Sequence, residues 1–271
     1  MIAKKSDEWR EDVAYPRSLV SVGHYHQAPG CEPIFDTMRF GRERIELMTG
    51  GRGWLKVEGE WVEVTPGALI WNVEGDQTIA RSDWKNPYRC LAVEIATPYL
   101  RGLRRAPRLA WWRDAEEVNR FTEEAVRWAV DERIDRTGLL AYVYGRLLFQ
   151  SRLWARTREQ EALPEPVRHA VALLEGELSL RLGEVAKRVG WSVPYLHEAF
   201  RTHLGTTPHE VALRRKMQLA RERLAATDHP VKRIAAECGF GGAAAFCHAF
   251  RERVGVTPLA YRRAATGARK G

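Results

Sequence analysis

The sequence predicts an α+β protein of two domains, in which an antiparallel β-barrel with two helices precedes an all-α domain. Between residues 35 and 95, short segments alternate apolar and polar residues and are separated by glycine-rich turns, as in small antiparallel barrels or sandwiches. From 114 to 155 the apolar period becomes helical, and a motif is duplicated in the last third of the chain. A chain of 271 residues that is 45% hydrophobic is long enough for two cores.

The expected strands of the first domain are short and end at turn residues. Arg44–Met48 and Trp54–Glu58 alternate, and a turn at Gly59-Glu60 predicts a hairpin into Trp61–Val64. The Pro66-Gly67 pair predicts a further turn. The remaining strands are expected at Ala68–Trp71, Gln77–Ala80 and Tyr88–Ile95.

Residues 1–35 are expected to be largely irregular, with His24-Tyr25-His26 on an edge strand. Cys31 and Glu32 follow these histidines, which raises the question of a metal site. Zinc sites need three or four convergent ligands, and this segment has no such set. We therefore predict surface histidines, no metal and no cofactor.

Two amphipathic helices are expected between Asp114 and Ala155, where they would pack on the barrel. Their apolar stripes are Val118, Phe121, Ala125 and Trp128, then Leu139, Leu140, Val143, Leu147 and Leu148. A polar segment from 157 to 166, ending in Pro-x-Pro, predicts a linker. Val167–Leu174 then predicts a leading helix of the second domain.

The second domain contains one pattern twice. Phe-Arg-x3-Gly-x-Thr-Pro begins at Phe200 and again at Phe250, 50 positions later. Upstream, a short helical period stops at Gly190 and, 49 positions later, at Gly239. Glycine ends a helix readily because it adopts positive φ. Each copy thus predicts a short helix, a glycine turn and a crossing second helix, with Ser192 as a helix N-cap in the first copy.

This helix-turn-helix arrangement places its second helix in the DNA major groove. The charge agrees with a polyanionic partner. From residue 164 onward there are 18 Lys and Arg against 10 Asp and Glu, so the whole formal charge of +8 lies in the last 108 residues.

Residues from about Pro166 to Arg263 resemble the DNA-binding domain of AraC-type transcription regulators, in the paired Phe-Arg…Gly-x-Thr-Pro ends and their spacing. The Gly-x-Gly-x-x-x-Val string from Gly51, followed by a hairpin and a Pro-Gly turn, resembles the cupin-like sensor domain of the same family. The resemblance implies an effector-binding and dimerisation domain at 1–156, a linker at 157–166 and a DNA-binding domain at 167–265. Its two helix-turn-helix units are expected at 182–203 and 231–253.

The resemblance also implies partners: double-stranded promoter DNA, a small effector such as a carbohydrate, a second copy of the chain and, for an activator, RNA polymerase. No enzyme activity is expected, because a catalytic cupin would need clustered histidine and carboxylate ligands. Four scattered cysteines, no apolar run of membrane-spanning length and no leader in the N-terminal residues predict a soluble, cytoplasmic protein.

Specific residues are expected to contact DNA. The resemblance implies that Pro194, His197 and Glu198 contact bases and that Arg201 lies near the DNA backbone. Further predicted base contacts are Ala243, Ala244 and His248, and further predicted backbone contacts are Ser192, Lys232, Arg233 and Arg251. A carboxylate accepts from cytosine N4, so Glu198 is predicted to select cytosine. The second recognition helix begins Gly-Ala-Ala-Ala from Gly242 and is predicted mainly to position the protein.

A helix over Pro208–Ala226 is expected to hold the two recognition helices near one DNA turn apart. Its buried stripe is predicted at Val211, Leu213, Met217, Ala220 and Leu224. Its cations are Arg214, Arg215, Lys216, Arg221 and Arg223, of which some are expected to meet phosphates and the rest water.

Four tryptophans lie within residues 54–84. Indoles stack on sugars, but they also fill small barrels, and both interpretations stay open. The candidate effector contacts are Glu46, Trp54, Trp71, Asn72, Tyr88 and Arg89. The histidine and stacking aromatic that sugar-responsive relatives carry on the last strands are absent near Tyr88, so the effector class is open. The alternative is a regulator whose first domain only oligomerises or binds a protein partner.

Overall fold

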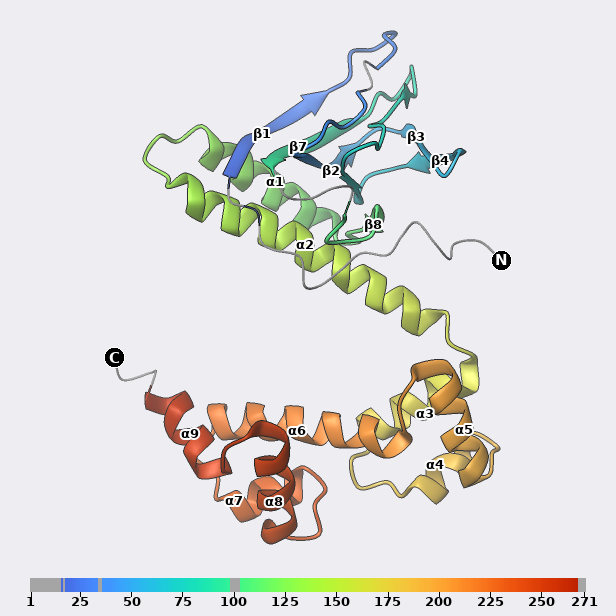
Figure 1. Cartoon of the computed structure of the whole chain (residues 1–271), viewed down its shortest axis with the longest axis vertical. Helices are drawn as coiled ribbons and strands as arrows, with labels where there is room; N and C mark the ends of the chain where they lie inside the picture. Colours follow the sequence, from blue (N-terminus) through green and yellow to red (C-terminus); the bar gives the residue numbers. More distant parts are fainter. Residues whose placement is uncertain (1–15, 17, 34–35, 98–102, 268–271) are drawn as a thin grey trace. The chain divides into compact units, whose positions relative to one another are not determined.

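The computed structural model describes residues 16, 18–33, 36–97 and 103–267. The expectation about a leader falls on residues 1–15 and lies outside them. The chain forms two compact units, Met1–Glu159 and Gln160–Gly271, called the N-terminal and C-terminal units below (Figure 1). Each is described by itself.

The N-terminal unit contains two antiparallel sheets. One has five strands in the order β1-β7-β2-β5-β8 and the other three in the order β4-β3-β6. The strands are β1 (Ser18–His26), β2 (Arg42–Gly50), β3 (Gly53–Val57), β4 (Glu60–Val64), β5 (Ala68–Asn72), β6 (Arg81–Ser82), β7 (Arg89–Ala96) and β8 (Leu109–Trp111). The expected antiparallel sheet region is thus present.

One predicted strand is wrong. Within 77–80, only Gln77 makes a bridge, to Thr37. The Thr78 amide donates to the Asp36 carbonyl at 3.0 Å, and the Thr78 hydroxyl accepts from the Asp36 amide at 3.0 Å. These bonds hold the start of the segment against residue 36. The Ala80 amide donates to the Trp54 carbonyl of β3 at 2.9 Å, and the paired strand begins at Arg81.

The predictions for β1 and for the first hairpin are confirmed with adjustments. The strand that carries His24 and His26 lies at the edge of its sheet, paired to β7, and begins earlier, at Ser18. The β3–β4 turn is centred on Glu58 and Gly59, with φ of 52° and 89°. Positive φ at both central residues is what tight hairpins need for strand twist. The short β8 has no counterpart among the predictions.

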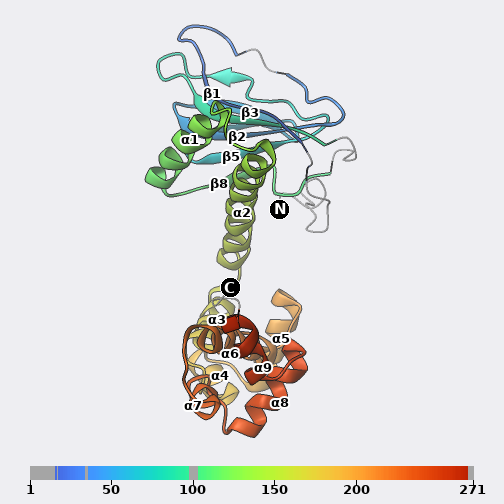
Figure 2. The same ribbon diagram turned by 90° about the vertical axis from the view of Figure 1, so that its left-hand side faces the viewer.

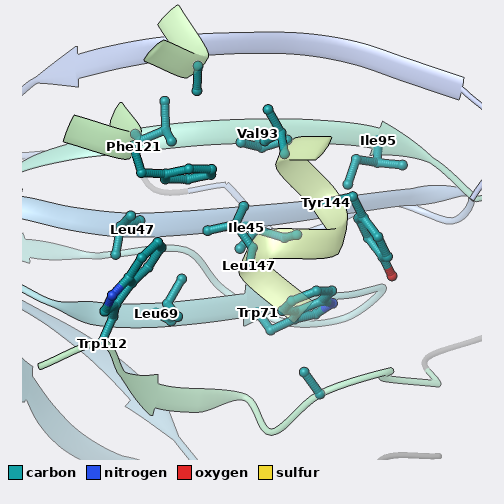
Figure 3. Close-up of a cluster of buried hydrophobic side chains, with 14 of the residues drawn as sticks. Ile45, Leu47, Leu69, Trp71, Val93, Ile95, Trp112, Phe121, Tyr144 and Leu147 are labelled. Atoms are coloured by element: carbon teal, nitrogen blue, oxygen red, sulfur yellow. The ribbon is translucent and has the colours of Figure 1, made fainter. Parts of the chain in front are cut away.

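The helices α1 (Ala115–Ala129) and α2 (Arg136–Glu161) cover one face of the five-stranded sheet. Because strand side chains alternate between faces, Ile45 and Leu47 point to this helix side together with Leu69 and Trp71 of β5 (Figure 3). Both predicted helical stripes are buried there, apart from Trp128 and Leu148, which are partly exposed.

The opposite face of the same sheet packs on the three-stranded sheet. Met48, Ile70 and Cys90 from the larger sheet meet Leu55 and Val64 from the smaller one, and all are buried. The central strands of the five-stranded sheet are therefore buried on both faces, and any polar side chain on them needs a partner.

The predicted linker is largely helical. Helix α2 continues through Thr157 to Glu161, and α3 (Glu165–Gly176) begins four residues later. Residues 162–164 alone are outside helices in this segment. Among the described helices, none combines the length and apolar content needed to cross a bilayer.

The C-terminal unit consists of helices (Figure 2). After α3 come α4 (Leu182–Arg188), α5 (Val193–Leu204), α6 (Pro208–Ala226), α7 (Val231–Glu237), α8 (Ala243–Val254) and α9 (Pro258–Gly267). We call α4–α5 the first helix pair and α7–α8 the second. Each pair has its own core, and α6 contributes to both, with Val211 in the first and Met217, Ala220 and Leu224 in the second.

The duplicated motif adopts the predicted structure. Gly190 and Gly239 have φ of 75° and 68°, so each turn uses the positive φ that glycine permits. Phe200 and Phe250, which begin the repeated pattern, are fully buried. Both α5 and α8 end at the next glycine of the pattern, in left-handed conformation.

Candidate nucleic-acid interface

Helix α5 presents a polar face to solvent. The Ser192 hydroxyl accepts from the Tyr195 amide at 3.3 Å, so it caps the helix start as predicted. Leu196, Ala199 and Phe200 are buried, whereas Pro194, Tyr195, His197, Glu198 and Arg201 are exposed. All the predicted contact residues of this helix are therefore accessible to a ligand.

Glu198 and Arg201 are paired on this face. The Arg201 guanidinium donates to the Glu198 carboxylate one helical turn away, and both side chains remain more than half exposed. An exposed pair of this kind is weak, worth about 0.2–1 kcal/mol, so DNA can compete for either partner. The cytosine contact predicted for Glu198 requires it to exchange this guanidinium for a base donor.

Helix α8 offers smaller side chains. Gly242 stands at its N-cap with no side-chain hydrogen bond, Ala243 is partly exposed, and Ala244, His248 and Arg251 are exposed. Methyl groups can contact thymine methyls but cannot form bidentate hydrogen bonds with bases. The second pair therefore exposes fewer hydrogen-bonding groups to base edges than the first.

Two exposed cations stand near the start of α7. Lys232 is exposed, and Arg233 donates through Nε to Glu237 at 2.8 Å. Hydrogen bonding to Arg233 lowers the pKa of the Glu237 carboxyl. Arg223 of α6 also reaches Glu237, at 3.6 Å, so this carboxylate is shared by two guanidinium groups.

Four of the five α6 cations expected at phosphates or in water make polar contacts within the unit, Arg223 with Glu237 as described above and three others as follows. Arg214 donates to the Thr206 hydroxyl at 3.0 Å, and Arg215 approaches the Glu175 carbonyl at 3.4 Å. Lys216 Nζ donates to the Gly239 carbonyl at 2.8 Å, and partial burial lowers the pKa of this lysine. Arg221 is exposed. The helix thus uses part of its charge to hold the fold together.

The candidate effector residues of the N-terminal unit fall on different surfaces. Trp71 is fully buried on the helix side, where its indole N–H donates to Glu43 and its ring packs edge-on against Tyr144 at 5.4 Å. It cannot share a binding surface with Glu46, because the two side chains leave opposite faces of the sheet. Trp71 is therefore part of the core on the helix side of the sheet.

Glu46, Asn72 and Tyr88 are buried on the face between the two sheets. The Asn72 amide donates to the Glu46 carboxylate at 3.0 Å, while the buried Asn72 Oδ1 lacks a hydrogen-bond partner among the described atoms. Burial raises the pKa of Glu46 to about 7, partly offset by Arg44 and the Asn72 bond. An acid poised near neutrality beside an unused amide acceptor is a polar feature that an apolar core would not need.

Trp54 and Arg89 lie apart from this cluster. Trp54 belongs to the outer face of the three-stranded sheet, where Trp61, Arg81 and Glu63 help line an open groove of about 590 Å³. The Arg81 guanidinium stacks 3.7 Å above the Trp61 ring. Arg89 is exposed. The six candidates therefore do not form a single site.

The sequence interpretation missed a buried ion pair. Arg105 donates to Glu43 at 2.7 Å and to the Tyr144 hydroxyl at 2.8 Å, and both charged side chains are almost fully buried. Burial raises the pKa of Glu43, with Arg105 acting in the opposite direction. Glu43 lies on the same face of its strand as Ile45, toward the helices. In the sequence, the buried pair was signalled only by a charged residue at a position where the alternation predicts an apolar one.

The histidines of β1 interact with each other and with Thr49. His24 Nε2 lies 2.8 Å from the Thr49 hydroxyl oxygen. His24 Nδ1 lies 2.8 Å from His26 Nε2. Burial, His26 and Arg89 lower the pKa of His24. In the described part of the chain, no three histidine, cysteine, aspartate or glutamate side chains come together as a possible metal site.

Two glycine-turn helix pairs, each with an exposed second helix, define the helix-turn-helix class of DNA-binding proteins. A family described as helix-turn-helix domain matches residues 185–264. The chain is 35% identical over 83 residues to the regulatory protein SoxS of Salmonella typhimurium, covering 31% of this chain and 78% of SoxS. It therefore belongs to the AraC family of transcription regulators, whose members are not enzymes.

Two further similarities each cover less than half of the chain. The probable transcriptional regulator LumQ of Photobacterium leiognathi is 35% identical over 63 residues, 23% of this chain and a quarter of LumQ. An AraC-type regulator from Chromobacterium violaceum has a similar solved structure, with 28% identity, a TM-score of 0.35 and coverage of 37% of this chain and 91% of that one. The chain thus matches a minor part of LumQ's own length.

Proposed function

We propose that this protein regulates transcription by binding promoter DNA through its C-terminal unit. The observation that carries the proposal is the pair of exposed recognition helices, α5 and α8, on one basic unit, in which residues 164–271 carry a net charge of +8. The base contacts we propose are Pro194, His197, Glu198, Ala243, Ala244 and His248. The backbone contacts we propose are Ser192, Arg201, Lys232, Arg233 and Arg251.

The two helices are proposed to contribute differently. Helix α5 reads bases through His197 and Glu198, with Glu198 accepting from a cytosine. Helix α8 mostly positions the protein, through Arg251 and the backbone amides at its start. RNA polymerase is a further proposed partner if the protein activates transcription.

Selection of bound duplexes from a random library by the full-length protein tests this function. We expect an enriched site about two turns long, with sharper base preference in one half, and affinity that falls as salt rises. Affinity should fall about equally for all sequences in Lys232→Ala, because a phosphate contact carries no base information. Failure to enrich any sequence at low salt would contradict the proposal.

We further propose that the N-terminal unit is a cupin-like sensor that binds a small effector between its two sheets. The support is the buried Glu46–Asn72 pair, whose Asn72 Oδ1 is available to accept a hydrogen bond. A hydroxyl-rich ligand such as a carbohydrate supplies donors for this acceptor and for the Glu46 carboxylate. Effector binding would act by favouring one of two conformations of the protein.

A thermal-shift screen of sugars, polyols and amines against the full chain tests the sensor proposal, because a ligand that binds the folded state raises its stability. A ligand of this site should lose its effect in Asn72→Leu and keep it in Trp54→Leu, which alters the outer groove. If a ligand still raises the melting temperature of Asn72→Leu, its binding site lies elsewhere in the protein.

We also propose that the N-terminal unit mediates dimerisation. Under the oligomerisation alternative, this would be one of the unit's roles in place of effector binding. Phe149 and Leu153 lie four residues apart on α2 and are 56% and 47% exposed, so they form an apolar stripe on the side away from the sheet. We expect sedimentation to show a dimer that Phe149→Asp dissociates. Dissociation without any ligand found by the screen would favour the oligomerisation alternative.

A further inference from the structure

The second helix pair contacts the α3–α4 loop that precedes the first pair, in addition to packing on α6. Gly239, in the turn of the second pair, packs against the loop between α3 and α4, so closely that a Cβ at this glycine would lie 2.6 Å from the Leu178 carbonyl oxygen. Lys216 Nζ, from the middle of α6, donates to the carbonyl of the same glycine at 2.8 Å. The second turn is therefore held from two sides.

A third contact joins the far end of α8 to the start of α6. Arg253 donates through both terminal guanidinium nitrogens to the two carboxylate oxygens of Glu210, with the Nη1–Oε1 distance at 2.8 Å. Glu210 is in the first turn of α6, where its amide donates to the Thr207 hydroxyl that caps the helix. Bidentate pairing fixes orientation as well as distance.

Without these contacts, the orientation of α8 would depend on the packing of the second core, to which α6, α7 and α9 contribute. With them, α8 is tied at its last turn to the start of α6 and, through Gly239, to the α3–α4 loop. Relying on the proposed function, we infer that Glu210 and Arg253 form a brace that sets which spacing between two half-sites on DNA the protein accepts.

The recognition helices explain why spacing matters here. Because α8 exposes Ala243, Ala244 and His248 toward its proposed groove, it offers few hydrogen bonds to bases. Its contribution to specificity then comes from where it is held relative to α5. Glu210 is a positioning residue in this scheme, since it acts through Arg253 and need not contact DNA.

The test compares Glu210→Gln with Glu222→Gln in the full-length chain. Both remove one carboxylate charge from α6, but among the described residues Glu222 bonds only to Gln218 of the same helix. Duplexes carry the sequence selected by the wild type, with the half-sites at the selected spacing or one base pair further apart. We expect Glu210→Gln to reduce the preference for the selected spacing about two- to fivefold, and Glu222→Gln to leave it unchanged.

The reversed pair, Glu210→Arg with Arg253→Glu, should recover the spacing preference. An equal loss of affinity at both spacings would overturn the inference, since it would show a charge or folding effect. Unchanged spacing preference in Glu210→Gln would overturn it equally.

A second measurement needs no DNA and separates failure of the brace from failure of the proposed function. Spin labels are placed at Thr202 and Ala245, which are exposed on α5 and α8, in a Cys31→Ser, Cys247→Ser background that retains the buried Cys90 and Cys238. Pulsed dipolar spectroscopy should give a broader or shifted distance distribution in Glu210→Gln than in Glu222→Gln. Identical distributions would overturn the brace even if the wild type binds DNA.

Discussion

The two helix pairs of the C-terminal unit share a fold but differ in the side chains that their second helices expose and in the contacts that their turns make. In both, a fully buried phenylalanine, Phe200 or Phe250, holds the second helix on its core. The first pair has a capped recognition helix and a charged outer face, whereas the second has an uncapped helix with alanines at its start and a turn packed against the α3–α4 loop. Core and turn repeat because folding requires them, while the outer face differs because folding does not constrain it.

The largest expected effect comes from truncating the buried phenylalanine in the core of each helix pair. Phe200→Ala and Phe250→Ala should each lower the free energy of unfolding of the C-terminal unit by about 3–5 kcal/mol, because both rings are fully buried. Chemical denaturation of the full-length protein, with hydrogen exchange to locate the loss, measures this. A cost below 1 kcal/mol for either variant would show that the two cores are not equivalent.

The second largest effect should distinguish the two turns. Gly190 and Gly239 both have positive φ, which costs an alanine about 1–2 kcal/mol. A Cβ at Gly190 meets open space, but at Gly239 it meets the Leu178 carbonyl, and such overpacking adds about 1–3 kcal/mol. Gly239→Ala should therefore destabilise more than Gly190→Ala in the same denaturation experiment. Equal costs would show that the α3–α4 loop moves aside freely.

In these turns, the sequence predicted the glycine conformation but not the contacts that the turns make. Gly190 and Gly239 are recognisable because a helical period stops at each, and positive φ follows from glycine chemistry. The contact of Gly239 with Leu178 joins residues 61 positions apart, and no local pattern encodes it. The same applies to Lys216, which the sequence presents as one more surface cation and whose Nζ donates in the structure to the partly buried Gly239 carbonyl.

The N-terminal unit shows the same limit. Alternation correctly placed Ile45 and Leu47 on one face, yet it could not say which face was covered by helices. The effector candidates include both Trp71 and Glu46 because of their side-chain chemistry, although the two side chains lie on opposite sides of the sheet. The Glu43–Arg105 pair spans 62 positions, so its buried partner could be found only in the folded chain.

The next prediction concerns reading of DNA. Glu198→Ala should abolish the preference for cytosine at one position in the half-site read by α5, a loss of about 1–3 kcal/mol in discrimination. His248→Ala should change base preference less, because α8 presents mainly methyl groups near its start. Binding to a library of single-base variants measures both. Loss of discrimination at positions in both half-sites from Glu198→Ala would contradict the separation of roles between the two helices.

The smallest effects should come from the helix N-caps, which are another difference between the two pairs. One variant removes the cap of α5 and the other adds a cap to α8. Ser192→Ala removes the hydroxyl that accepts from the Tyr195 amide, which should cost about 1 kcal/mol. Gly242→Ser introduces such an acceptor at the start of α8, where the backbone is extended and a Cβ meets no neighbour. It should stabilise the unit by a few tenths of a kcal/mol. Thermal unfolding of the two variants beside the wild type measures both signs, and a destabilising Gly242→Ser would mean that the second helix requires the bare backbone of glycine at its start.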